Sequence, residues 1–219
     1  MRLPVVSSTF AAALAVTFVA SAQDRPNASP SHADHQAMHS TPHEMHAAGP
    51  TVSFSQLKAT VDQLDRARAA TEKYRDVGAA RDDGYEAIGP YVIGMGYHYV
   101  RSRQPDRGFD IEHPPILLYQ KDTTAAGGLQ LVGVSYLFNA PAGPDGQPVG
   151  SPFPPALAKW HKHGNLCVMP DRSVETRLDD QECARRGGRF SAETQWMVHA
   201  WIWKDSPAGV FSPLNPSVW

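Results

Sequence analysis

Hydrophobic side chains first recur at helical spacing just after residue 52. The stripe with steps of three and four residues consists of Leu57, Val61, Leu64 and Ala67 or Arg68. Ser53 or Ser55 precedes this stretch, and either hydroxyl suits a helix N-cap. The pattern predicts one helix over residues 54–72 and a second, short helix that ends near Gly84.

After Gly89 and Pro90 the hydrophobic period falls towards two, which is typical of strands. The segments with this period are 91–100, 116–120, 129–138, 165–169 and 196–203. A turn around residues 122–128 joins the second and third segments as a hairpin. Because strands and helices do not alternate, we expect residues 53–219 to form one α+β domain. It should contain an antiparallel sheet or half-barrel with one or two N-terminal helices packed against it.

The first residues have the pattern of a secretory signal peptide. Arg2 supplies positive charge, residues 10–19 are almost continuously apolar, and Ala20 and Ala22 give a small-x-small cleavage pattern. The apolar run is shorter than the roughly 20 residues that a membrane span needs. We expect residues 1–22 to be removed, leaving a periplasmic or secreted protein with no membrane span; the alternative is an uncleaved anchor.

Residues 23–52 show no apolar periodicity and are predicted to form a disordered linker. The histidines of this linker are spaced three or four residues apart: His32, His35, His39, His43 and His46. Imidazole is a common ligand of borderline metals, so this tract could capture Cu, Zn or Ni loosely. The alternative is a polar linker whose histidines have no function.

Charge and composition exclude several classes of protein. The chain has 219 residues and a formal net charge of −2, so it lacks the basic footprint of nucleic-acid binding. Nineteen prolines and seventeen glycines argue against a helical bundle. Two cysteines exclude a cysteine-rich zinc or iron–sulfur module, and in an exported chain we expect Cys167 and Cys183 to form a disulfide.

The predicted domain contains a set of candidate metal ligands. They are His98, His161, His163, His199 and Glu112. His98 and His199 lie in aromatic-rich strands, and His161 and His163 stand two apart, so an extended segment would turn both rings to one side. We expect His98 and His199 to lie in one cluster, with His161 or His163 as its third member and Zn or Cu as the bound ion.

Other interpretations of these residues stay open. Each ring could instead bond a backbone carbonyl or lie at the surface, and the aromatic residues around Trp201 could line a pocket for a small organic ligand. The sequence thus predicts an exported protein that binds a metal ion or small ligand. A metal-dependent enzyme, hydrolytic or oxidative, would use the same histidines. A structural or interaction role in the cell envelope is the third possibility.

Several sequence blocks resemble known proteins. The blocks GMGYHYV, HPPILLY, LQLVGVSYLF and VHAWIWKDSPAGVFSPLNPSV resemble those of a group of uncharacterised exported bacterial proteins. In this chain the segment Asp205-Ser206-Pro207 stands where that group has an asparagine before the proline. Residues 131–138, followed by the W-H-K-H segment at 160–163, are similar to plant oil-body-associated proteins. The second resemblance implies a related fold, and neither implies a reaction, a cofactor or a catalytic residue.

The composition of residues 23–52 leads to a prediction about proteolysis. A segment with so few apolar side chains cannot offset its chain entropy by burial. Limited proteolysis of the metal-free protein should therefore remove it and leave a stable core that starts between about residues 51 and 54. Protection of the tract from the protease would contradict the prediction.

Overall fold

The computed structural model describes residues 51–101 and 108–219. These residues belong to one compact unit, Ala47–Trp219. The predicted signal peptide and the five histidines of the predicted linker lie outside the described residues.

The N-terminal helix forms as the hydrophobic stripe predicts. Helix α1 (Phe54–Thr71) begins at Ser53 with a capping box. The Gln56 N–H donates to the Ser53 hydroxyl at 3.2 Å, and the Ser53 N–H donates to the Gln56 side-chain oxygen at 2.9 Å. The predicted second helix is divided into a 3₁₀ helix η1 (Glu72–Arg75) and a short helix α2 (Val77–Asp82).

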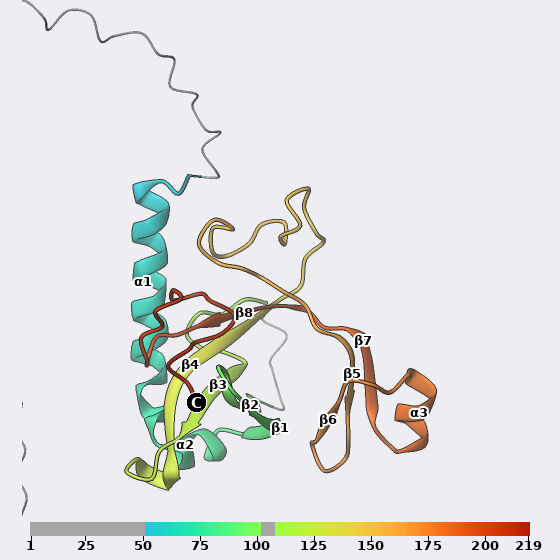
Figure 1. Ribbon diagram of the computed structural model, residues 1–219. Coiled ribbons are helices and arrows are strands. Elements are labelled where there is room, and N and C mark those ends of the chain that lie inside the picture. Colours follow the sequence, from blue (N-terminus) through green and yellow to red (C-terminus); the bar gives the residue numbers. More distant parts are fainter. Residues whose placement is uncertain (1–50, 102–107) are drawn as a thin grey trace, which may run out of the picture. The chain divides into compact units, whose positions relative to one another are not determined.

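The larger sheet is antiparallel, with the order β1-β2-β3-β4-β8 (Figure 1). Its strands are β1 (Tyr85–Val92), β2 (Gly96–Arg101), β3 (Ile116–Lys121), β4 (Leu129–Phe138) and β8 (Trp196–Ala200). The predicted hairpin joins β3 to β4, with the 3₁₀ turn η2 (Ala126–Gly128) between them. Because β1 and β8 lie at opposite edges, the sheet is open and not a closed barrel. The predicted α+β class is confirmed.

Two predicted strands have different bounds in the structure. Residues 91–100, expected to form one strand, contain the turn between β1 and β2. Gly94 permits the reversal, since it lies in this turn with a φ of +83° and the Met95 N–H closes the turn by donating to the Val92 carbonyl at 2.9 Å. The last strand ends at Ala200, because the Trp201 N–H bonds the Val210 carbonyl and not a neighbouring strand.

A smaller, three-stranded sheet has the order β6-β5-β7. Its strands are β5 (Gly164–Val168), β6 (Val174–Glu175) and β7 (Arg189–Glu193), and helix α3 (Asp180–Arg185) lies between β6 and β7 in the chain. The sequence patterns predict only β5 among them. The predicted disulfide is confirmed: it joins Cys167 of β5 to Cys183 of α3, and both residues are fully buried.

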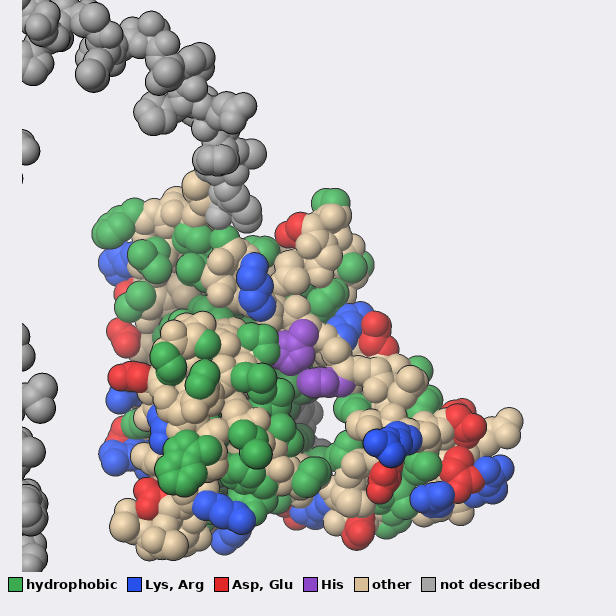
Figure 2. All heavy atoms as spheres, in the orientation of Figure 1, with side chains coloured by type: hydrophobic (Ala, Val, Ile, Leu, Met, Phe, Trp, Pro, Cys, Tyr) green, Lys and Arg blue, Asp and Glu red, His purple; other side chains and the backbone are tan. Residues whose placement is uncertain are grey.

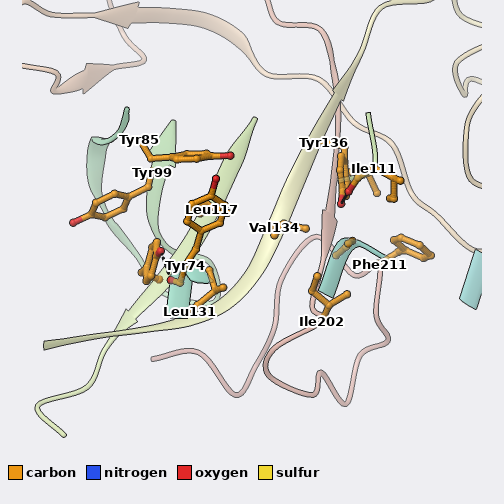
Figure 3. Packing of buried hydrophobic residues seen from close by; sticks show 14 of the residues in the cluster. Tyr74, Tyr85, Tyr99, Ile111, Leu117, Leu131, Val134, Tyr136, Ile202 and Phe211 are labelled. Carbon is orange, nitrogen blue, oxygen red and sulfur yellow. Dashed lines mark hydrogen bonds between the residues drawn. The ribbon is translucent and has the colours of Figure 1, made fainter. Parts of the chain in front are cut away.

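The helices cover one face of the larger sheet and form the main core with it. Buried tyrosines from neighbouring strands pack together on this face (Figure 3). Their hydroxyls find backbone partners: Tyr85 donates to the Pro114 carbonyl at 2.7 Å, and Tyr136 donates to that of Ile111 at 2.7 Å. In α1, Ala67 is buried, whereas Val61 in the first half of the helix is 47% exposed.

The opposite face of the sheet carries a second, smaller core. It consists of Ile116, Leu118, Val132, Met197, Trp201 and Val218. The chain after β8 returns to cover this face, where the Gly94 N–H donates to the Val218 carbonyl and the Asn215 N–H donates to the Gly94 carbonyl, both at 2.8 Å. The histidines of the candidate site lie on this second face.

The disulfide leads to a stability prediction. It closes a loop with a sequence separation of 16, which in the chain-entropy model contributes about 3 kcal/mol. The double variant Cys167→Ser/Cys183→Ser should therefore lose about that much unfolding free energy in urea titrations. Wild-type protein unfolded without reductant should show no reactive thiol; two thiols per chain would contradict the disulfide.

Candidate metal centre

The pairing of the strands places His98 and His199 on the same face of the larger sheet. His98 of β2 lies opposite Leu118 of β3, which lies opposite Gly133 of β4. Two residues further along β4, Ser135 lies opposite His199 of β8. Directly opposed residues share a face, as do residues two apart in a strand, so both histidines project on the side away from the helices.

His161 and His163 lie in a segment that pairs with β8 on the side away from β4. The His161 N–H donates to the Met197 carbonyl at 2.9 Å, and the Met197 N–H donates to the His161 carbonyl at 2.7 Å. The His163 N–H donates to the Thr194 hydroxyl oxygen at 2.9 Å. This backbone pairing extends the sheet by one short segment beyond β8 and brings both rings to the second face.

The four rings form one chain of neighbours, which we call the histidine cluster (His98, His161, His163 and His199). Ring centroids lie 6.0 Å apart for His98 and His199, 5.4 Å for His161 and His199, and 5.1 Å for His161 and His163. Figure 2 shows histidine side chains next to one another at the surface of the molecule. Two rings on one tetrahedral zinc ion have centroids about 5 Å apart, given a Zn–N bond of about 2.1 Å. The observed separations are close to that value.

Backbone carbonyls orient the two rings at the centre of the cluster. The His199 Nδ1 lies 2.8 Å from the Pro213 carbonyl oxygen, and the His161 Nδ1 lies 3.4 Å from that of Lys159. Since a carbonyl can only accept, each Nδ1 carries the hydrogen and each Nε2 presents a lone pair. Both Nε2 atoms are buried without a hydrogen-bond partner among the described residues.

Burial keeps these rings neutral. Desolvation, followed by the neighbouring His163, lowers the pKa of His98 from 6.5 to about 4. Desolvation, followed by His98 and His161, lowers the pKa of His199 to about 3. The pKa of His161 is also lowered, chiefly by burial. A neutral imidazole is the form that binds metal, so these rings are competent ligands at neutral pH.

The nitrogen atoms do not already converge on one point. Within residues 51–101 and 108–219, no group of three or more His, Cys, Asp or Glu side chains has the geometry of a formed metal site. Successive ring centroids lie 5.1–6.0 Å apart, near the spacing of two rings on one ion, but the rings would have to rotate to bring three nitrogens to one point.

Glu112, the fifth predicted ligand, has a different neighbour. Its carboxylate lies 3.6 Å from the Arg66 guanidinium of α1, and its side chain is about half exposed. Helix α1 covers the other face of the sheet, so the structure gives Glu112 no contact with the histidine cluster. The nearby His113 bonds Asp110 at 2.9 Å and is also outside the cluster.

Sequence reasoning missed three groups that border the cluster. Two are the carbonyls of Lys159 and Pro213, which no side-chain pattern could reveal. The third is Ser135, a fully buried hydroxyl in an otherwise apolar stretch of β4. Its signal was present, because residues 131–136 (L-V-G-V-S-Y) are buried on both faces of the sheet and Ser135 is the small polar residue among them.

Comparisons with protein-family models, curated proteins and solved structures found no match to this chain.

The lowered histidine pKa values predict how stability depends on pH. In the unfolded chain these rings take up protons near pH 6.5, whereas in the folded chain His98 and His199 do so near pH 4 and 3. The unfolded state therefore binds more protons between these limits, and the unfolding free energy of metal-free protein should fall as pH falls from about 6.5 to 4.

Replacing one buried ring should flatten this profile. His199→Gln should remove about 3 kcal/mol of the loss at pH 4, as measured by urea unfolding at a series of pH values. Equal slopes for His199→Gln and wild type would show that His199 is not held neutral by burial.

Proposed function

We propose that this chain binds a divalent transition metal, Zn²⁺ or Cu²⁺, through His98, His161 and His199, with His163 beside them. The observation that carries the proposal is the pair of buried, unpartnered Nε2 atoms on His161 and His199. Each belongs to a ring whose Nδ1 hydrogen is already directed to a carbonyl. Metal-ligating histidines usually donate their other ring N–H to a carbonyl, a carboxylate or a water in this way.

The energetics of the free site favour a ligand. A buried polar atom without a partner costs about 1–3 kcal/mol, and this cluster contains two such nitrogens within neighbouring rings. A proton is a poor partner for these nitrogens, because burial disfavours the charged imidazolium. A metal ion can bond both nitrogens at once while leaving the rings neutral, which makes it the occupant that satisfies both constraints.

The donor atoms restrict the kind of metal. Both cysteines are joined in the disulfide, so no thiolate is present to select a softer ion. The ring contacts of the cluster are all between imidazoles, apart from the contact between His199 and Trp201. Nitrogen ligands of this kind suit Zn²⁺ and Cu²⁺, whereas Mg²⁺ and Ca²⁺ require oxygen donors.

We also propose that this binding takes place outside the cytoplasm. The disulfide supports export, because such bonds persist mainly in oxidising compartments. The signal-peptide pattern of residues 1–22 supports it as well. In the part of the chain that the structure describes, no helix has the length and apolar character needed to cross a membrane.

The test must separate the histidine cluster from the histidines of the linker. A serine-tract chain retains its full length but carries His32→Ser, His35→Ser, His39→Ser, His43→Ser and His46→Ser. Isothermal titration with Zn²⁺ and Cu²⁺ should show one tight site per chain for one or both ions. In this background, His98→Gln, His161→Gln and His199→Gln should each weaken binding at least about 100-fold, which exceeds most second-shell effects.

Two matched variants complete the experiment. His163→Gln removes a ring at the edge of the cluster and should weaken binding less than about tenfold. His113→Gln removes a histidine outside the cluster and should have no effect. Absence of a tight site in the serine-tract chain, or an equal loss in His113→Gln and His199→Gln, would refute the proposed function.

A further inference from the structure

A buried hydroxyl lies beneath the histidine cluster, on the surface of the sheet. His98 on β2 and His199 on β8 are separated by β3 and β4, which amounts to three strand spacings, or about 14 Å. Their ring centroids are only 6.0 Å apart, so the two side chains lean towards each other over β3 and β4. The residues of these two strands that face the rings are Leu118, Ile116, Gly133 and Ser135.

Ser135 is the polar member of this set, and its position is defined by the strand register. It is directly paired with His199, so their Cβ atoms are about 5 Å apart and point to the same side. Gly133, two residues away, has no room for a side chain, since a Cβ there would lie 2.8 Å from the Ala200 carbonyl oxygen. Trp201 packs against Gly133, with its Cε3 2.9 Å from where that Cβ would lie, so Ser135 supplies the polar side chain on this part of β4.

The Ser135 hydroxyl is fully buried and has no hydrogen-bond partner among the residues that the structure describes. Some buried hydroxyls of this fold are satisfied, since Thr71 donates to the Ala67 carbonyl at 2.7 Å and Tyr119 donates to that of Tyr74 at 2.6 Å. The hydroxyls of Tyr91 and Ser206 also lack a partner among the described residues, but neither is paired with a histidine of the cluster. A buried hydroxyl without a partner is costly, and this one shares its region with the two unpartnered histidine nitrogens. Three unsatisfied groups on neighbouring segments indicate one shared occupant.

We propose that the ion held by the histidine cluster keeps one position open for an exchangeable ligand, a water, a hydroxide or a small anion, and that Ser135 hydrogen-bonds this ligand. The inference rests on the proposed function. Three histidine ligands leave the fourth position of a tetrahedral ion free. A serine hydroxyl can donate to an anion or hydroxide and accept from a water, so it suits every member of this ligand class.

The consequence is a centre that binds and polarises a small ligand, in contrast to a closed structural site. Structural zinc sites fill all four positions with protein atoms, whereas sites that act on a ligand keep one position exchangeable. Ser135 acts as a positioning residue here, because it touches the exchangeable ligand and not the metal.

Azide is a suitable probe, because it is a small anion that binds to an open metal position. The serine-tract chain loaded with Co²⁺ reports such binding through its visible absorption spectrum. Azide should bind to this protein with saturation, and Ser135→Ala should raise the azide Kd about tenfold through loss of one hydrogen bond to a charged group. Co²⁺ affinity should change far less than azide affinity.

Ser206→Ala is the matched control. The Ser206 hydroxyl is also buried without a partner among the described residues, but Ser206 lies in the segment after β8 and its register gives it no pairing with a histidine. It should leave azide binding unchanged. In the metal-free state, Ser135→Ala should be as stable as the parent chain or more so, because the substitution removes an unsatisfied polar atom.

The possible outcomes distinguish the two proposals. If Co²⁺ binds but azide does not, the coordination is closed and the further inference is wrong. If azide binds equally well to the parent and to Ser135→Ala, Ser135 has no part in holding the ligand and the inference is again wrong. If the serine-tract chain binds none of Co²⁺, Zn²⁺ and Cu²⁺, the proposed function itself fails.

Discussion

The pairing of β4 with β3 on one side and β8 on the other is the constraint on which the rest of this structure depends. It determines which side chains of the central strand meet the helices and which meet the second face. Val134 and Tyr136 join the tyrosine-rich core, whereas Ser135 between them faces the histidine cluster. A shift of one residue would turn Ser135 and His199 into the main core and expose Tyr136, so the same hydrophobic burial that stabilises the domain also positions the candidate site.

Burial then determines the chemistry that the site can perform. An exposed histidine exchanges protons near neutral pH, but the desolvated rings of His98 and His199 have pKa values of about 4 and 3. The fold therefore contains neutral imidazoles, and the Nε2 atoms of His161 and His199 find no protein donor among the described residues. Unpartnered buried nitrogens lower the stability of the free protein. Under the proposed function, the same desolvated nitrogens would link the stability of the domain to metal binding.

The sequence predicts the parts of this fold that local pattern determines. The bounds of α1 and β4 and the β3–β4 hairpin follow from spacing and alternation. The Cys167–Cys183 disulfide follows from the presence of just two cysteines in a chain expected to be exported. The β1–β2 turn does not follow, because Ile93, Gly94 and Met95 lie within a run that otherwise has the pattern of one strand. Strands β6 and β7 and helix α3 are short and largely polar, so no periodicity reveals them. The four histidines could be grouped by residue type. The separation of Glu112 from them could not be predicted, because its ion pair with Arg66 joins it to a helix that lies far away in the sequence.

The orientation of the site depends on the chain that follows β8 as much as on the strands. Once β8 ends, the Trp201 indole N–H donates to the Ser212 carbonyl at 2.7 Å, and the next carbonyl, that of Pro213, accepts from His199. The Asn215 N–H then bonds Gly94 in the turn before β2, the strand that carries His98. One returning segment therefore holds both the His199 ring and the turn that leads to His98. Because these contacts are made by consecutive backbone groups, a change in this segment would alter the relative placement of the two rings without altering any ligand.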